Sequence, residues 1–342
     1  MLTLGVYLSS AALSQDIKIH AAPQLDMPGQ VDSNSPAFWY NGQFNLLNST
    51  GDGPMRSQGS DQFHLGAAQA VPMTHLGKGW PTWIEATWVD PTGPIFGWYH
   101  QEVWGVCGAA SRLAVPQIGA AVSYDGGASW RDLGIVLSAG DPINCAEQNG
   151  YFAGGNGDPF VMPDAEGQYF YFFFGHYGGP LKQQGVVMAR MPFAARFGPL
   201  GNVWKYHSGE WNEPGIGGRT TPIFPARVGW EQSDTNAFWG PSLHWNPYLG
   251  QYVMLLNKSC CTAGFPQEGI YASFTKDLSK PDSWTKPKKF MDNDGWYPQV
   301  LGLEAEKGTD SQAGRRARLY IYGHSSWEIE FVKPTAPAAP SQ

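Results

Sequence analysis

The sequence predicts an all-β protein, and three observations support this prediction. Helical periodicity is nearly absent from the 342 residues, whereas short apolar runs such as YFYFFFG and LYIYG recur along the chain. Gly (43 residues) and Pro (27 residues) are abundant, which suits many tight turns between short strands. The third observation is a pair of apolar runs, separated by a turn, that returns five times.

This repeated hairpin predicts the architecture. Four of the five copies have a proline near the start, and the first four have a glycine in the intervening turn. Repetition at long intervals is typical of a β-propeller, so we expect five four-stranded antiparallel blades. The copies are NSPAFWYNGQFNLLNS (34–49), IEATWVDPTGPIFGWYH (84–100), DPFVMPDAEGQYFYFFFG (158–175), GPSLHWNPYLGQYVMLLN (240–257) and YPQVLG…RARLYIYG (297–323).

The remaining strands complete the blades and close the ring. The segments 118–137 and 269–290 each supply a third and a fourth strand. The last blade offers only three strands, so DIKIHA (16–21) is expected to add the fourth from the other end of the chain, which removes a free edge. The alternative is a loosely docked N-terminal arm.

The predicted organisation is one propeller domain over residues 15–333, followed by a disordered tail, PTAPAAPSQ (334–342). Residues 1–14 resemble the remnant of an export signal, because an apolar stretch precedes a small-x-small pattern at Ala12-Leu13-Ser14, although no basic segment comes before it. We therefore expect a secreted or periplasmic protein.

Charge and hydropathy exclude two classes of partner. The net charge of -7 argues against nucleic acid, since phosphate binding needs a basic face. No apolar run approaches the roughly 18 residues of a membrane span. With 15 Trp, 15 Tyr and 18 Phe, the chain holds more aromatic surface than a core alone needs, and sugar rings present flat faces to such side chains. We expect a monomer that binds carbohydrate.

Four cysteines are present, with no C-x-x-C spacing that would indicate a structural zinc site. In an exported protein, an even number permits a Cys107–Cys145 disulfide and a vicinal bridge between Cys260 and Cys261. The alternative is four unpaired thiols.

The functional face is predicted from propeller geometry. The first strand of each blade lines the central channel, and the loop between the second and third strands opens on the face where that first strand begins. These loops are long and rich in polar and aromatic residues, so this rim is the expected place for a site. They read STGDGPMRSQGSDQFH, HQEVWGVCGAASR, GHYGGPLKQQ and NKSCCTAGFPQE.

Acidic residues at or before the first strands of separate blades give the chain a family resemblance. The arrangement resembles the propeller glycoside hydrolases: the arabinanases and xylosidases of family forty-three and their invertase-like and neoagarobiose-hydrolase relatives. Asp158-Pro159 matches the family's Asp-Pro in blade three, whereas Asp32 lies four residues before Pro36 in blade one. In blade four the family presents a Glu before Gly/Ala-Pro, but Trp239 precedes Gly240-Pro241 here.

A second motif is structural. SYDGGASW (123–130) matches the Asp-box, S-x-D-x-G-x-[ST]-W, in which Ser123 and Asp125 tie a hairpin above Trp130. The motif also occurs in sialidases, but the arginine triad of a sialidase cannot be placed in this sequence.

Glycosyl transfer to water needs two carboxyl groups on opposite sides of the bond, and a third can raise the pKa of the acid. We assign Asp32 as the base, Glu85 as the acid and Asp158 as the modulator. An inverting enzyme would hold base and acid about 6.5–9.5 Å apart. The alternative acids are Glu268, His176 and His244, of which His244 fits a hydrogen-bonded core position better.

The substrate-binding residues are expected on the same rim, where aromatic rings stack on sugars and polar groups orient them. No cofactor is expected, although such propellers sometimes hold a calcium or halide ion in the central channel. The predicted binding residues are Arg56, His100, His176, Trp239, Glu268, Trp296 and Tyr297.

Taken together, these features predict a glycoside hydrolase that acts on a poly- or oligosaccharide, with arabinose-containing furanosides as the first expectation. The absent family glutamate at position 239 keeps a non-catalytic carbohydrate-binding propeller open, and a protein-interaction propeller is a further alternative. The sugar, the linkage, the stereochemical outcome and endo or exo action stay open.

Overall fold

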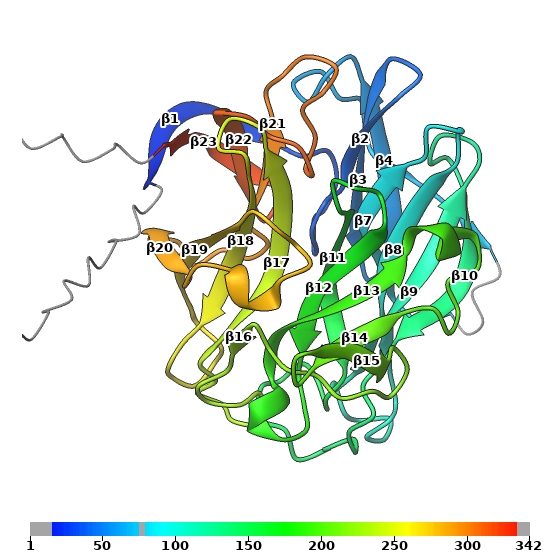
Figure 1. Cartoon of the computed structure of the whole chain (residues 1–342), viewed down its shortest axis with the longest axis vertical. Coiled ribbons are helices and arrows are strands. Elements are labelled where there is room, and N and C mark those ends of the chain that lie inside the picture. The colour runs from blue at the N-terminus through cyan, green and yellow to red at the C-terminus, as the bar shows by residue number, and fades with distance from the viewer. Residues whose placement is uncertain (1–15, 75–78, 334–342) are drawn as a thin grey trace, which may run out of the picture.

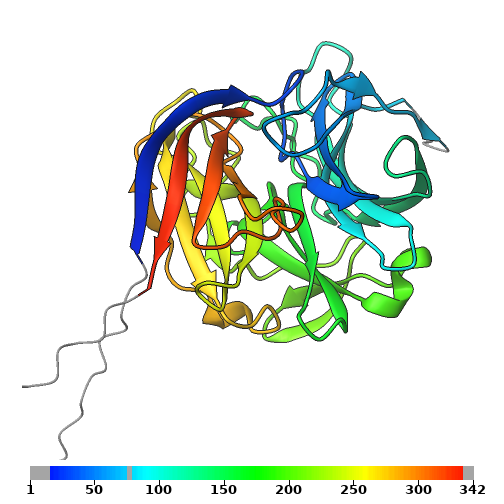
Figure 2. The ribbon, with the colours of Figure 1, turned by 90° about the horizontal axis from the view of Figure 1, so that it is seen from above.

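The computed structural model describes residues 16–74 and 79–333, and it forms a ring of five β-sheets around a common axis (Figures 1 and 2). The predicted export signal (1–14) and tail (334–342) lie outside the described residues. Three 3-10 helices, at Leu181–Gln183, Phe193–Phe197 and Pro281–Ser283, are all too short to span a bilayer. The prediction of an all-β, five-bladed propeller is confirmed.

The four main strands of each blade pair antiparallel, with the first strand innermost, and two blades carry additional short strands, one of which pairs in parallel. Blade I contains β2 (Ala37–Tyr40), β3 (Gln43–Thr50), β4 (Gly53–Gly59) and β5 (Gln69–Ala70). Blade II contains β7 (Thr82–Val89), β8 (Ile95–Val103), β9 (Val115–Ser123) and β10 (Trp130–Leu137), with β6 (Met73–Thr74) at its edge. Blade III contains β11 (Asn156–Pro163), β12 (Tyr169–His176), β13 (Gly185–Pro192), β14 (Trp204–His207), β15 (Glu210–Pro214) and β16 (Phe224–Pro225). Blade IV contains β17 (Ala237–Asn246), β18 (Gln251–Ser259), β19 (Gln267–Thr275) and β20 (Lys288–Met291).

Blade V closes the ring with strands from both ends of the chain. It contains β21 (Gln299–Gly302), β22 (Arg316–Ile321) and β23 (His324–Val332), and β1 (Asp16–Asp26) pairs antiparallel with β23. Figure 2 shows the blue β1 alongside the red β23. Ile19 lies opposite Ile329 in this pairing, and the segment 16–21 supplies the missing fourth strand as the sequence predicts.

Apolar side chains fill the spaces between neighbouring blades. Trp98 and Phe172 belong to the cluster between blades II and III, and Phe173 and Leu256 belong to the cluster between blades III and IV. Because alternate residues of a strand point to opposite faces, Phe172 and Phe173 pack on different neighbours. The aromatic runs that identify the strands therefore also hold the ring together.

The innermost strands of blades II, III and IV share a local irregularity near their N-terminal ends. The pairing register shifts around Glu85 in blade II, around Asp158 in blade III and around Gly240 in blade IV. A bulge of this kind turns one side chain away from its regular direction. In blades III, IV and V the residue before the proline, Asp158, Gly240 or Tyr297, has a left-handed φ of 49°, 57° or 54°.

The hairpin SYDGGASW is held by its own side chains. The Ser123 hydroxyl donates to Asp125 Oδ1 (2.8 Å), and Asp125 accepts from the Ser129 amide (2.9 Å). Trp130 is buried beneath the turn. Arg56, on the neighbouring blade, donates to the carbonyl oxygen of Gly126 (2.6 Å), so the turn also joins blades I and II.

Candidate active site

An aromatic cavity of about 130 Å³ lies where the first strands of the blades begin. Three carboxyl groups line it, from Asp32, Glu102 and Asp158. The remaining walls are aromatic, and the T-shaped contact between Trp239 and Trp296 (ring centroids 5.2 Å apart) forms part of them. The other lining residues are Tyr151, Phe152, Tyr177, Trp230, Phe265 and Tyr297.

Asp158 is the carboxyl group held most firmly. It is buried in the bulge of β11, and the Tyr177 hydroxyl donates to its Oδ2. Burial raises the pKa of Asp158; the charge of His100 and hydrogen bonds from Tyr177 and Tyr297 lower it, and the charge of Glu102 raises it, with a net upward shift. The left-handed backbone at this aspartate costs about 1–3 kcal/mol, which the surrounding contacts must offset.

Asp32 and Glu102 reach the cavity from blades I and II. Asp32 precedes β2, where its amide donates to the carbonyl oxygen of Ser49 (2.9 Å). Burial raises the pKa of Asp32 to about 6, and the charges of Asp158 and Glu102 add to this shift. Glu102, near the end of β8, accepts a hydrogen bond from Trp104 Nε1 (3.0 Å). The charges of Asp158 and Glu102 therefore favour the protonated form of Asp32.

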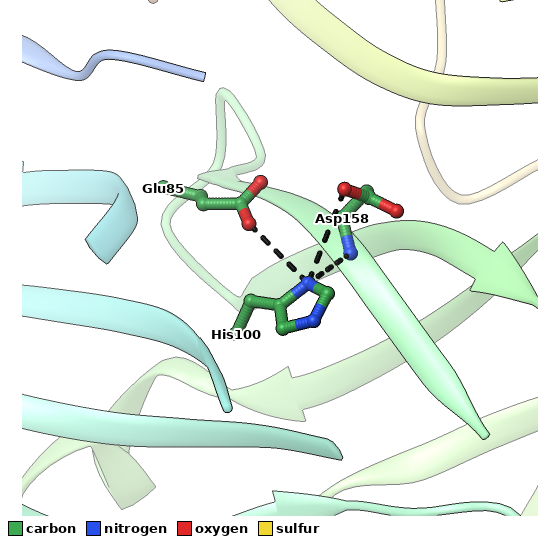
Figure 3. A group of neighbouring side chains, drawn as sticks. All are labelled: Glu85, His100 and Asp158. Carbon is green, nitrogen blue, oxygen red and sulfur yellow. Dashed lines mark hydrogen bonds and ion pairs between the residues drawn. The ribbon is translucent and has the colours of Figure 1, made fainter. Parts of the chain in front are cut away.

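Glu85 lies behind these groups rather than in the cavity lining. It is 1% exposed in the bulge of β7, and its Oε1 is 3.5 Å from His100 Nδ1 (Figure 3). Burial raises the pKa of Glu85 to about 8, even though its hydrogen bond with His100 lowers it. Within the described residues, Glu85 Oε2 has no hydrogen-bond partner. This placement fits a protonated Glu85 that contacts His100 behind the cavity wall.

His100 connects the buried acid to the cavity. Burial lowers the pKa of His100, but Glu102, Glu85 and Asp158 raise it by more, so that the net shift is well above the usual value. The amide of Asp158 nevertheless donates to His100 Nδ1 (3.0 Å), and protonating Nδ1 would break this hydrogen bond. The other ring nitrogen, Nε2, is 3.7 Å from Glu102 Oε1. His100 therefore orients Asp158 and faces Glu102.

Among the described residues, one group has a spacing that could suit a metal ion. Glu85, His100 and Asp158 place potential ligand atoms within 4.8 Å of one another. Calcium takes about six to eight oxygen ligands, whereas this group includes an imidazole whose Nδ1 already accepts the Asp158 amide. These three residues therefore do not fit the calcium ion that the family resemblance allows.

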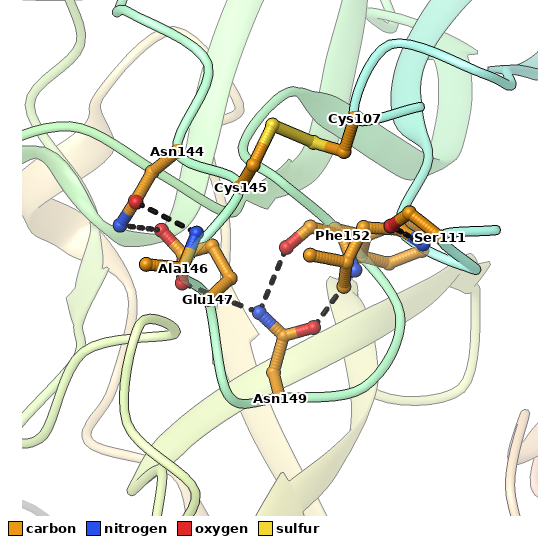
Figure 4. The surroundings of a disulfide bond; sticks show 9 residues. Cys107, Ser111, Asn144, Cys145, Ala146, Glu147, Asn149 and Phe152 are labelled. Carbon is orange, nitrogen blue, oxygen red and sulfur yellow. Dashed lines mark hydrogen bonds between the residues drawn. A yellow bond between two sulfur atoms is a disulfide. The ribbon is translucent and has the colours of Figure 1, made fainter. Parts of the chain in front are cut away.

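A disulfide-bonded loop supplies one aromatic wall. Cys107, in the loop after β8, is bonded to Cys145, in the loop before β11 (Figure 4). The Asn149 side chain accepts from the amides of Tyr151 (2.8 Å) and Phe152 (2.7 Å) and donates to the carbonyl oxygen of Phe152 (2.9 Å). The predicted Cys107–Cys145 bond is confirmed, and Cys260 and Cys261 are bonded to each other as well.

The structure brings some of the predicted binding residues to the cavity and leaves others away from it. Trp239, Trp296 and Tyr297 line it. Arg56 does not, because β4 begins directly after a tight turn and carries Arg56 down the blade towards Gly126. The loop expected around Arg56 is therefore shorter than the sequence suggests.

Three alternative acids also lie outside the lining of the cavity. Glu268 is paired with Lys258 (2.5 Å) on the surface of blade IV. His176 is fully buried, with its Nε2 3.1 Å from Asp141. His244 is a core residue whose pKa burial lowers to about 3, and its Nε2 has no hydrogen-bond partner within the described residues.

Sequence reasoning missed several residues of the cavity. Glu102 could have been found, because it lies two residues after His100 and alternate residues of a strand share a face. Tyr177 follows directly after the strand that ends at His176. Trp230 and Phe265 lie in irregular segments and have no local signal in the sequence.

Comparisons with known proteins agree with the fold. No protein-family model matches the chain, and no curated protein matches it. A thermostable family-43 glycoside hydrolase superimposes with a TM-score of 0.51 at 9% identity, over 91% of this chain and 96% of that chain.

Two arabinan-degrading enzymes give similar values. An exo-1,5-α-L-arabinanase from a bovine ruminal metagenomic library has a TM-score of 0.50 at 12% identity, over 89% of this chain and 95% of that chain. An endo-arabinase from Bacteroides thetaiotaomicron has a TM-score of 0.50 at 10% identity, over 89% and 94% of the two chains. At such low identities the likeness shows the shared propeller fold.

Proposed function

We propose that this protein is a glycoside hydrolase that cleaves a poly- or oligosaccharide by acid/base catalysis in the aromatic cavity. One observation carries the proposal: Asp32, Glu102 and Asp158, from three different blades, line a single cavity with aromatic walls. Carboxyl pairs and flat apolar surfaces are what glycosidic hydrolysis and sugar binding require. The fold that the chain shares with family-43 and arabinanase structures agrees with this chemistry.

The catalytic roles are assigned according to which carboxyl groups line the cavity and can contact a bound sugar. Asp32, partly exposed, is proposed as the base that takes a proton from water while the water oxygen attacks the anomeric carbon. A general acid must come within hydrogen-bond distance of the leaving oxygen. Glu102 lines the cavity and Glu85 does not, so we propose that Glu102 gives its proton to that oxygen as the glycosidic bond breaks. Asp158 is proposed as the modulator, held in place by Tyr177 and His100.

The substrate and the cellular location are proposed at a coarser level. Arabinose-containing glycans are the first substrates to test, since two of the solved structures that share the fold are arabinan-degrading enzymes. The Cys107–Cys145 disulfide favours an oxidising compartment, so we propose that the protein acts outside the cytoplasm. A monomeric state stays a prediction.

The test is a panel of neutral polysaccharides and aryl glycosides, incubated with the purified protein and with its Asp32→Asn variant. We expect the wild type to release reducing sugar from at least one substrate, and the variant to lose about 10²–10⁴-fold in rate. Binding of the same substrate to the variant should persist. Binding without turnover in the wild type would instead identify a carbohydrate-binding propeller.

A further inference from the structure

A second hollow meets the aromatic cavity at Asp32. It has a volume of about 510 Å³ and is lined by Gly29, Gln30, Val31, Asp32, Thr50 and Tyr322. Asp32 is therefore shared by two hollows that differ in character: one is a small aromatic cavity, and the other is larger and more polar. A carboxyl group with space on both sides can act on a bond whose two sugars lie in different hollows.

Tyr322 is an unusual residue for its position. It occupies the turn between β22 and β23 with a φ of 53°, followed by Gly323 with a φ of 72°. Two consecutive left-handed residues in a hairpin turn favour Asn-Gly, and a bulky tyrosine is a rare occupant. The Tyr322 ring is also 52% exposed. An exposed aromatic ring held in an unfavourable backbone conformation suggests a role other than stability.

The ring of Tyr322 extends the aromatic surface of the first cavity into the second hollow. It lies nearly parallel to the ring of Tyr297, with centroids 6.4 Å apart and an interplanar angle of 15°. Tyr297 lines the first cavity and Tyr322 lines the second. Burial and then the charge of Asp32 raise the pKa of the Tyr322 hydroxyl, which agrees with the closeness of the two side chains.

We propose that Tyr322, with Gln30 and Thr50, forms a second sugar subsite across Asp32 from the aromatic cavity, so that a sugar chain occupies both hollows with the scissile bond beside Asp32. This inference rests on the proposed function and adds that the substrate is a polymer bound on both sides of the scissile bond. The ring of Tyr322 stacks on a sugar, while Gln30 and Thr50 offer polar groups to its hydroxyls.

The test variant is Tyr322→Asn, because asparagine suits the left-handed turn and the hairpin should fold at least as well. The matched control is Tyr124→Asn, at a tyrosine that is 63% exposed in the turn between β9 and β10 and lines neither hollow. Both are compared with the wild type on whichever polysaccharide of the panel is hydrolysed, and on a ladder of oligosaccharides of increasing length prepared from it.

Tyr322→Asn should raise KM for the longer oligosaccharides about tenfold, with little change for the shortest substrate, and Tyr124→Asn should match the wild type. Equal length dependence in Tyr322→Asn and wild type would reject the second subsite while leaving the Asp32-dependent hydrolysis intact. Absence of any hydrolysis on the panel would reject the proposed function and this inference with it.

Discussion

The innermost strands of blades III and IV have the same backbone and different chemistry. Each has a bulge before a proline, and Asp158 and Gly240 occupy the equivalent position with φ values of 49° and 57°. Glycine adopts this conformation at little cost, whereas an aspartate is strained there. In blade III the hydrogen bond from the Tyr177 hydroxyl to the Asp158 carboxyl group helps to offset this backbone strain.

Blade IV contributes to the same cavity in another way. Gly240 has no side chain, and the wall there comes from Trp239, whose Nε1 donates to Gln267 (2.9 Å). Tyr297 in blade V repeats the left-handed position with an aromatic side chain. Blades III, IV and V therefore repeat one backbone conformation with different side chains: a carboxyl group in blade III, no side chain in blade IV and an aromatic ring in blade V.

The largest effect is expected when Asp158 in blade III is replaced by glycine, the residue that blade IV has at the equivalent position. Asp158→Gly should keep the backbone of the bulge and remove the carboxyl group, and Asp158→Asn should keep the shape and remove the charge. We expect both variants to lose about 10²-fold or more in kcat, because the modulator acts through its charge. The measurement is steady-state hydrolysis together with calorimetric binding of the substrate. Retention of full activity in Asp158→Gly would contradict the role given to this position.

The position in blade II provides the next test, because Glu85 also lies in a bulge but does not line the cavity. Glu102→Gln should lower kcat about 10²-fold or more, as expected for loss of a general acid. Glu85→Gln keeps the shape of a residue that burial holds in its protonated form, so we expect less than about tenfold loss. The two matched variants are compared by kcat on an aryl glycoside. The opposite ranking would return the acid role to Glu85.

The Asp158 carboxylate, which has no counterpart in blade IV, should also shift the pH dependence of hydrolysis. Asp32 must be ionised to act as a base, and its raised pKa of about 6 predicts that kcat/KM falls about tenfold per pH unit below that value. Because the charge of Asp158 helps to raise this pKa, the residual activity of Asp158→Asn should show its acidic limb at lower pH. Circular dichroism across the same range checks that the fold persists. An unchanged limb in the variant would show that the two carboxyl groups do not interact.

The smallest effect is expected when the glycine of the blade IV bulge, Gly240, is given a side chain. Gly240→Ala adds a Cβ that meets Asn257 Oδ1 at 3.6 Å, an ordinary contact, so the cost comes from the left-handed backbone alone. We expect a loss of about 1 kcal/mol in the free energy of unfolding, measured by denaturant titration. Gly198→Ala is the matched control, since Gly198 has a φ of -139° and its added Cβ meets nothing within 4 Å. Equal stability of the two variants would contradict the strain argument.

Local patterns in the sequence identify most of the fold but only part of the site. The alternation in DIKIHA and the hairpin in 158–175 depend on neighbours along the chain, and all three strands form as expected. Asp158 was recognisable because a proline follows it. Arg56 was misplaced, because the length of a turn and the start of the next strand decide whether a residue stays on the rim. Glu102 was overlooked although it shares a strand face with His100.

The sequence by itself determined the blades, the closing strand and the aspartates at the beginning of the channel strands, because hydrophobic alternation, glycine turns and prolines act over a few residues. Only the tertiary structure decided that Glu102 faces the cavity, that Glu85 is buried behind it and that Trp230 and Phe265 complete the walls. The physical reason is that burial, charge coupling and the meeting of loops depend on how far apart segments lie in space, and the ring brings together residues that are far apart along the chain.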